Sequence, residues 1–366
     1  MTLEELHYAI ALKQIPSVGD TTAKKLIQHF GSAKAIFKTS PRELASLTGI
    51  GKVKRDAFKD PAYLIKAEEE VRFIEQENIK CTYFTDKDYP HYLKQCIDSP
   101  IVLFSKGNID LQNKKIISIV GTRKITSSGI AFCEELIESL SPLNPVIVSG
   151  FAYGADITAH KAAINNKLQN IACLAHGLDQ IYPKVHKKYM KAVAENGGFM
   201  TDFCSFKKFD RNNFLARNRI IAGLSQATIV IESAVKGGSL VTATIANSYN
   251  RDVFAVPGRP TDQYSKGCNN LIKRQMAHLL SDPADLIYHL NWDITPKKES
   301  RQTQLNLDLT ENEEKCLEVL RKKRKAELDE VAISCAYTTS KTASILLNLE
   351  LKGLVRPLPG KQFEYI

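Results

Sequence analysis

The sequence predicts an α/β protein, in which a doubly wound sheet of mostly parallel strands lies between a small helical domain and a C-terminal winged-helix domain. Apolar runs alternate with helical segments through the middle of the chain, as they do when helices cover both faces of a parallel sheet. The two ends of the chain lack such runs and show short helical patterns instead. A chain of 366 residues is expected to form two or three domains.

Residues 1–65 are predicted to form a helical domain of the helix-hairpin-helix or SAM-like type. Two glycine-containing turns, at residues 15–20 and 47–51, each separate short helical patterns. The backbone N–H groups of such a turn, at the start of a helix, can hold a phosphate. Basic residues follow the second turn, so we expect that turn to contact DNA and the first turn to serve as scaffold.

Residues 66–290 are predicted to form an extended Rossmann-like domain with right-handed crossovers between its parallel strands. Two early apolar runs, at 79–84 and 100–107, would add edge strands or a small lead-in lobe. The predicted core strands are the later apolar runs, at residues 116–121, 145–150, 170–177, 227–233 and 251–258.

The polar stretch 291–309 is interpreted as a linker, and residues 310–366 as a winged-helix domain. Thr310 to Glu313 form an N-cap signal before the first of three predicted helices. A short hairpin around residues 359–360 would form the wing. The presumed recognition helix offers only Lys341 and Lys352 as basic groups, so a protein-contact role competes with duplex recognition.

Composition favours a polyanionic partner and argues against a membrane or secreted protein. The net charge is +10 and the pI about 9.0. The sequence has no apolar run long enough to span a bilayer, and its N-terminus does not resemble a signal peptide. The eight cysteines are scattered, as is typical of reduced core thiols. We therefore expect a cytoplasmic protein with no membrane partner.

Glycines and small polar residues follow the predicted strands and are expected to converge on one crevice, because ligands of open α/β sheets bind beyond the carboxyl ends of the strands. Glycine lets a backbone approach a phosphate closely, and the start of the next helix favours an anion. The turns are Gly121-Thr122-Arg123, Ser149-Gly150, His176-Gly177 and Gly237-Gly238-Ser239.

Cations and an aromatic residue lie near these turns, notably Lys184 and the segment RNNFLARNR at residues 211–219. Such a mixture suits a single strand whose phosphates are tracked while a base stacks. Arg217 and Arg219 point to different faces of a helix, so at least one should be solvated or ion-paired, and Phe214 could instead belong to the core. The candidate DNA-binding residues are Gly121, Thr122, Arg123, Ser149, Gly150, Lys184, Arg211, Phe214, Asn218, Arg219, Gly237, Gly238 and Ser239.

Patterns for catalysis, cofactors and metals are incomplete. No G-x-S-x-G elbow, P-loop or G-x-G-x-x-G motif occurs, so neither a nucleophile nor a nucleotide cofactor is expected. Asp156 and His160 could share one helix face, but a third metal ligand is missing. We expect no catalytic residue, no cofactor and no metal.

The ordered motifs resemble the DNA-processing protein A family (DprA, also called Smf). They are IVGTR (119–123), SGFAYGADITAH (149–160), HGLDQIYPK (176–184), FLARNRIIAGLS (214–225), ESAVKGGSLVTATIA (232–246) and VFAVPG (253–258).

The resemblance implies a protein that binds single-stranded DNA with little sequence preference. It implies protection of incoming DNA in natural transformation, loading of the RecA recombinase and a homodimer formed through the Rossmann-like domain. By motif position, DNA contacts would fall on Arg123, Lys184, Arg211, Phe214 and the turn 237–239.

Two alternatives come from other functional classes. Phosphoribohydrolases of the same fold superfamily carry a PGGxGT turn before a helix with a catalytic glutamate. Here the turn reads GGSLVT and the following residues, ATIANS, contain no glutamate, which disfavours such an enzyme. A winged-helix regulator that reads duplex DNA is the second alternative.

Overall fold

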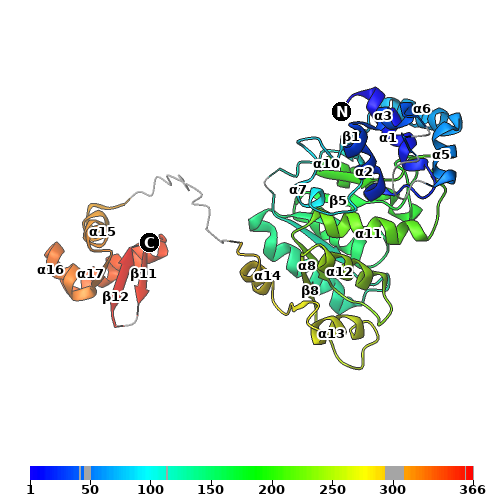
Figure 1. Cartoon of the computed structure of the whole chain (residues 1–366). Helices are drawn as coiled ribbons and strands as arrows, with labels where there is room; N and C mark the ends of the chain where they lie inside the picture. Colours follow the sequence, from blue (N-terminus) through cyan, green and yellow to red (C-terminus); the bar gives the residue numbers. More distant parts are fainter. Residues whose placement is uncertain (41–42, 45–50, 113, 293–308, 359, 366) are drawn as a thin grey trace. The chain divides into compact units, whose positions relative to one another are not determined.

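The computed structural model describes the chain except for residues 41–42, 45–50, 113, 293–308, 359 and 366. The chain divides into two compact units, residues 1–294 and 295–366 (Figure 1). Most of the predicted linker falls on residues 293–308, outside the described part of the chain. The first unit contains both the helical domain and the sheet, and the second is the winged-helix domain.

The first unit is built on a nine-stranded sheet with the order β1-β2-β6-β5-β4-β3-β7-β8-β9. β1 pairs antiparallel with β2, and β2 with β6, while all other neighbours are parallel. The strands are β1 (Lys80–Tyr83), β2 (Val102–Gly107), β3 (Ile116–Val120), β4 (Val146–Ser149), β5 (Asn170–Cys173), β6 (Gly197–Thr201), β7 (Ala227–Val230), β8 (Asp252–Ala255) and β9 (His278–Leu279).

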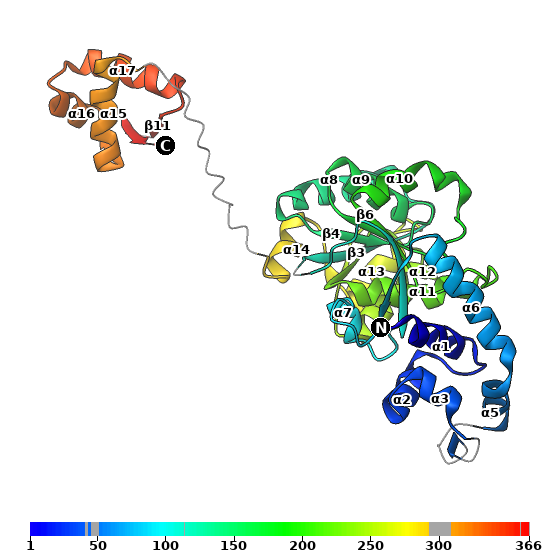
Figure 2. The same cartoon turned by 90° about the horizontal axis from the view of Figure 1, so that it is seen from above.

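Helices cover both faces of this sheet. Figure 2 shows α8 (Ser127–Leu140), α9 (Ala155–Asn165) and α10 (Met190–Glu195) on one side. α11 (Asn212–Leu224), α12 (Gly238–Ser248) and α13 (Lys266–Lys273) lie on the other side. The remaining helices of this domain are α7 (His91–Lys94), α14 (Pro283–His289) and the 3-10 turns η1 (Ser141–Leu143) and η2 (Lys184–Tyr189).

The alternation of side chains along β3 explains how one strand supports two cores. Ile117 and Ile119 pack in the core that includes α8 and α9, whereas Ile116 and Val120 pack in the core that includes α11 and α12. Both faces are therefore apolar, which produces the continuous apolar run seen in the sequence. The predicted doubly wound α/β fold is confirmed, and the runs at 79–84 and 100–107 form the antiparallel strands β1 and β2.

β6, whose first two residues are glycines, was not predicted from the sequence. A Cβ atom on Gly197 would lie 1.9 Å from the carbonyl oxygen of Asn170, and one on Gly198 would lie 2.3 Å from that of Lys106. Gly197 also has φ +139°, which side chains disfavour. A glycine pair normally indicates a turn. Here the two glycines allow the neighbouring strand backbones to approach.

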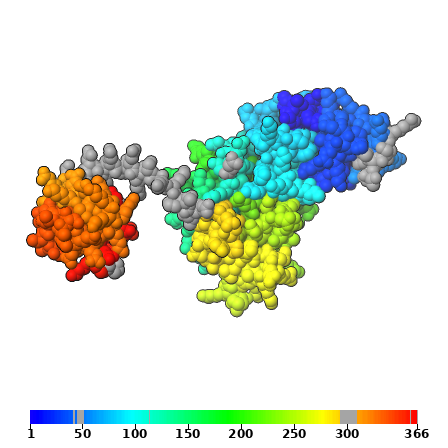
Figure 3. Space-filling model, turned by 60° about the vertical axis from the view of Figure 1, so that its left-hand side comes forward, coloured from blue at the N-terminus to red at the C-terminus, as the bar shows by residue number. Residues whose placement is uncertain are grey.

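The N-terminal helices pack onto the antiparallel edge of the sheet. They are α1 (Leu3–Gln14), α2 (Asp20–Phe30), α3 (Ala33–Lys38), α5 (Lys52–Lys59) and α6 (Pro61–Gln76). One apolar core joins them to β1 and β2 through Tyr83, Val102 and Phe104. In Figure 3 the blue N-terminal helices form a continuous surface with the cyan segment that carries these strands. The domain boundary expected at residue 65 falls inside α6.

The winged-helix unit has its own core around Cys316, Leu320, Leu346 and Leu349. Its predicted helices and wing are confirmed, with one additional strand, β10, and the sheet order β10-β12-β11. The elements are α15 (Glu311–Lys323), β10 (Lys325–Glu327), α16 (Leu328–Cys335), α17 (Thr339–Leu351), β11 (Val355–Leu358) and β12 (Gln362–Tyr365).

Thr310 begins α15 with the predicted capping box, so Thr310→Ala should destabilise this unit by about 1 kcal/mol. The backbone N–H of Thr310 donates to Glu313 at 2.8 Å, and that of Glu313 donates to the Thr310 hydroxyl at 3.4 Å. Hydrogen–deuterium exchange of the α15 amides in the full chain would measure the change. Thr310→Ser keeps the acceptor oxygen and should exchange as the native chain does, and equal protection in both variants would contradict the prediction.

The same cap should weaken in acid. The hydrogen bond from Lys352, at 2.9 Å, and the bonds from Thr310 hold the pKa of Glu313 below its ordinary value. A carboxyl whose pKa is lower in the folded state than in the unfolded state stabilises the fold at pH values above its unfolded-state pKa. This stabilisation is lost as the pH falls through its folded-state pKa.

Candidate nucleic-acid interface

A crevice of about 420 Å³ opens at the carboxyl ends of β3 and β7. From β3 the chain winds outward through β4, β5 and β6, and then returns to β7 on the other side of β3. The crevice therefore lies at the topological switch point, where doubly wound sheets bind ligands. Most of the predicted site residues line it, namely Gly121, Thr122, Arg123, Arg211, Phe214, Asn218, Gly237, Gly238 and Ser239.

Two backbone turns form one side of the crevice. Gly121 follows β3 where a Cβ atom would lie 2.6 Å from that of Ala155, so only glycine fits without movement. Gly237 precedes α12, which starts without a side-chain cap among the described residues. The first amides of α12 are thus available to an anion, and the helix dipole favours negative charge there.

Arg123 and Phe214 face each other across the crevice. The guanidinium carbon of Arg123 lies 5.3 Å from the centroid of the Phe214 ring, within the range of a cation–π contact. Arg123 is exposed and Phe214 is half-buried. The interpretation of Phe214 as a core residue is therefore wrong, since its ring lines the crevice.

Arg217 and Asp156 lie beneath these groups, both buried. Arg217 donates to the carbonyl oxygen of Gly150 at 2.7 Å and to that of Cys173, and so ties together the ends of β4 and β5. Burial raises the pKa of the Asp156 carboxyl, although Arg217 opposes the shift. Burial likewise lowers the pKa of Arg217, and Asp156 counteracts it. This pair supports the crevice floor.

The structure places three predicted contacts outside the crevice lining. Ser149 is fully buried and donates to the carbonyl oxygen of Ile119 at 2.6 Å. Gly150 is buried too, and a Cβ atom there would lie 2.6 Å from the Arg217 guanidinium. These two residues were chosen because they end a strand, but Arg217 covers that strand end. Lys184 is exposed at the start of η2 and does not belong to the crevice lining.

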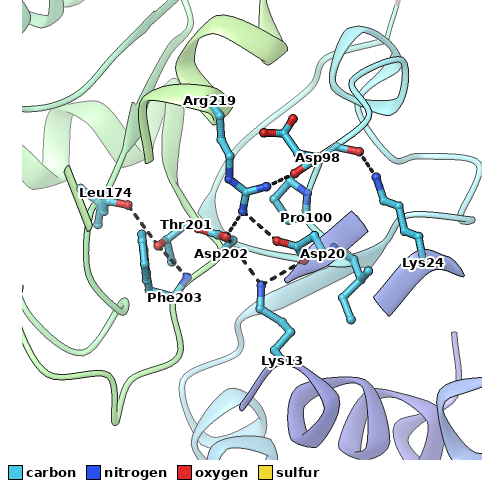
Figure 4. Close-up of polar contacts among 12 residues, drawn as sticks. Lys13, Asp20, Lys24, Asp98, Pro100, Leu174, Thr201, Asp202, Phe203 and Arg219 are labelled. Atoms are coloured by element: carbon cyan, nitrogen blue, oxygen red, sulfur yellow. Dashed lines mark hydrogen bonds and ion pairs between the residues drawn. The ribbon is translucent and has the colours of Figure 1, made fainter. Parts of the chain in front are cut away.

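Arg219 also does not line the crevice, because its guanidinium forms ion pairs elsewhere. It donates to Asp20 at 2.9 Å and also to Asp202, and reaches the carbonyl oxygen of Asp98 (Figure 4). Its side chain is only 15% exposed. Of the two arginines that the sequence could not separate, Arg219 is the ion-paired one.

The Arg219 cluster also includes Asp20, the last residue of the first glycine turn. Asp20, at the start of α2, accepts hydrogen bonds from Arg219 and from the backbone N–H of Ile101. The Asp20 side chain therefore ties the start of α2 to the sheet domain, although α2, like α12, starts without a side-chain cap among the described residues. The scaffold role of the first turn stays a prediction. Residues 47–50 of the second turn lie outside the described part of the chain.

Known families match this chain along most of its length. A family model described as DNA recombination-mediator protein A matches residues 80–291, more than half of the chain. The chain belongs to the DprA/Smf family. A helix-hairpin-helix motif model matches residues 9–59, and a DprA winged helix domain model matches residues 301–361. The first of these supports the helix-hairpin-helix alternative for the N-terminal domain.

Individual members of the DprA/Smf family are similar over long stretches. Protein Smf of Synechocystis sp. is 30% identical over 397 residues, covering 100% of both chains. The DNA processing protein DprA of Streptococcus pneumoniae is 38% identical over 202 residues, covering 55% of this chain and 71% of the relative.

Solved structures of the family agree with this fold. DprA from Streptococcus pneumoniae has a TM-score of 0.66 at 29% identity, covering 79% of this chain and 98% of that chain. DNA processing protein A from Helicobacter pylori, whose structure is described by its single-stranded DNA binding mode, has a TM-score of 0.53 at 27% identity. That match covers 58% of this chain and 95% of the other. The role of this chain is thus DprA-type DNA processing.

Sequence reasoning missed residues around the crevice of this DprA/Smf family member. Lys236 lines it from the loop before α12, and Tyr182 and Phe209 lie beside Phe214. Tyr182 belongs to the motif that contains Lys184, and Phe209 to the run FKKFD. Phe209 lies between Lys208 and Arg211, and Tyr182 lies two residues before Lys184; these neighbouring cations were the signal that could have identified both rings.

Within the residues that the structure describes, His, Cys, Asp and Glu side chains form no group of three or more that could hold a metal ion. None of the helices in the described ranges combines the length and the apolar character needed to cross a bilayer.

Proposed function

We propose that this protein binds single-stranded DNA in the crevice without sequence preference. The observation that carries the proposal is the meeting of an uncapped helix start, exposed cations and an aromatic ring at the switch point. Arg123, Arg211 and Lys236 suit phosphates, and the Phe214 ring suits an unpaired base. Paired bases are stacked inside a duplex, so a ring of this kind favours a single strand.

Sequence independence follows from the type of contact. Backbone N–H groups and guanidinium groups recognise phosphates, which carry no sequence information. An aromatic ring stacks on any base, because every base has a π face. The single-strand binding described for the Helicobacter pylori relative supports the same ligand here.

We further propose the biological role that family membership suggests. The protein would protect incoming DNA in natural transformation and load RecA onto it, acting in the cytoplasm as a homodimer formed through the Rossmann-like domain. Its role would be to hold the strand and not to catalyse a reaction on it. α12, the helix that carries a catalytic glutamate in related phosphoribohydrolases, contains no acidic residue in this chain.

Fluorescence anisotropy with labelled oligo-dT, oligo-dA and a duplex of equal length tests the proposal. Both single strands are expected to bind more tightly than the duplex. Their affinity should fall with salt, with a log–log slope of about 0.7 per phosphate contact. Tighter duplex binding would instead favour the winged-helix regulator, and release of free base from a nucleoside monophosphate would favour the phosphoribohydrolase.

A second assay addresses the RecA step. Single-stranded DNA coated with single-strand-binding protein is mixed with RecA, and ATP hydrolysis by RecA reports filament formation. The protein is expected to shorten the lag before hydrolysis. An unchanged lag, together with retained oligo-dT binding, would contradict the loading role and leave the binding role intact.

A further inference from the structure

Two aromatic side chains extend the crevice along the surface beyond Phe214. The Tyr182 ring lies 5.6 Å from the Phe214 ring and 4.9 Å from that of Phe209, and the Phe209 and Phe214 rings are 5.5 Å apart. Each of the three rings therefore contacts both others. Tyr182 precedes η2 and Phe209 precedes α11, so two loops distant in sequence bring the rings together.

The outer two rings are unusually open to solvent for aromatic residues. Tyr182 is 38% exposed and Phe209 46% exposed. Neither is stacked face to face with its neighbour, because the interplanar angles are 53° for Tyr182 on Phe209 and 73° for Phe209 on Phe214. Exposed apolar groups that touch one another commonly indicate a binding surface.

The charges around these rings indicate what the surface binds. Lys184 follows Tyr182 by two residues, and Lys207, Lys208 and Arg211 flank Phe209; all four are exposed. Within the described residues none of the four forms an ion pair, although Asp210 lies among them. Cations that neighbour exposed aromatic rings in the sequence suit a ligand that carries both negative charges and flat apolar groups.

We propose that Tyr182 and Phe209 form a second base-stacking platform, which holds an unpaired nucleobase next to the nucleotide on Phe214. The proposal rests on the proposed function, since the strand must first occupy the crevice. Lys184 and Lys208 then contact phosphates outside the crevice lining. The occupant is single-stranded nucleic acid, because the rings are continuous with the crevice and the flanking charge is positive.

Affinity for fluorescein-labelled oligo-dT tests the platform. Phe209→Ala and Tyr182→Ala are each expected to weaken binding about fivefold or more, the effect of losing one stacked base. Phe209→Leu keeps apolar bulk without a ring and should weaken binding too, whereas Phe209→Tyr should bind as the native chain does. Val185→Ala, an exposed apolar residue without a ring in the same segment, is the matched control and should have no effect.

A second readout separates stacking from a general change in the surface. An oligonucleotide of abasic sites keeps the phosphates but offers no base. The native chain should prefer oligo-dT over it, and Phe209→Ala should lose part of that preference with little change in affinity for the abasic strand. Equal losses on both oligonucleotides would overturn the platform.

The outcomes distinguish this inference from the proposed function. If the native chain does not bind oligo-dT, the proposed function itself fails. If the native chain binds and both alanine variants bind equally well, the crevice is retained and the platform is overturned. If Phe209→Ala instead alters the sedimentation coefficient without altering oligo-dT affinity, the rings form a contact between copies of the chain, which also overturns the platform.

Discussion

Arg219→Met is expected to lower the free energy of unfolding of the first unit by about 3–5 kcal/mol, the effect of breaking a buried ion pair from one side. The variant leaves Asp20 and Asp202 in a site where their side chains are 13% and 8% exposed. Lys13 remains nearby, at 3.9 Å from Asp20 and 3.7 Å from Asp202, which are longer ion-pair distances than the 2.9 Å between Arg219 and Asp20. Arg219 makes the shortest ion pairs to both carboxylates, so its loss leaves them with the more distant Lys13 alone.

Urea unfolding followed by tryptophan fluorescence measures this loss. Trp292 is the single tryptophan of the chain and is buried in the core beside α8 and α9, so its signal reports the first unit. Arg219→Lys keeps the charge and should lose less than the methionine variant. A loss below about 1 kcal/mol, the value of a surface pair, would show that the cluster is solvated.

The difference between Arg219→Met and the native chain should also depend on pH. Burial by itself would raise the pKa of Asp20, but Lys13 and Arg219 lower it below the ordinary value. A carboxyl with a depressed folded-state pKa stabilises the fold above its unfolded pKa, and this contribution disappears as the pH falls through the folded value. The native chain should therefore exceed the Arg219→Met variant in free energy of unfolding by the whole amount near neutral pH, and this difference should become smaller in acid.

The fold could be predicted because each strand and each turn is recognisable from a short stretch of the sequence. A strand such as β3 is buried at every position and apolar at all of them except Ser118, since both of its faces are covered. The residues that follow it into the crevice come directly after it in the sequence. Gly121, Thr122 and Arg123 were therefore found from the sequence. The switch point needs only the order of the strands, which right-handed crossovers restrict strongly.

Contacts between distant residues were not predictable in the same way. Helical spacing separates the directions of Arg217 and Arg219, but it does not reveal that Asp20, 199 positions away from Arg219, lies opposite it. Ser149 and Gly150 satisfy the rule for strand ends, and only the buried Arg217 removes them from the surface. Exposure of an aromatic residue likewise depends on how its loop folds.

Among the residues of the crevice, Arg123 is expected to have the largest effect on the binding of single-stranded DNA. Arg123→Ala is expected to weaken oligo-dT binding about 10- to 100-fold, the effect of removing hydrogen bonds to a charged group. The side chain is exposed, so its removal leaves no buried charge behind and the unfolding free energy should change by less than about 0.5 kcal/mol. Because a phosphate contact is lost, the salt dependence should become shallower by about 0.7 in log–log slope.

Lys124→Ala is the matched control, because Lys124 is an adjacent exposed cation that does not line the crevice. Equal effects of the two alanine variants would mean that net charge alone holds the strand, which contradicts a built phosphate site. Arg123→Lys separates two roles of the guanidinium. It keeps the charge but not the planar group that lies over Phe214, so an intermediate affinity is expected if the arginine both binds a phosphate and orients the ring on which a base stacks.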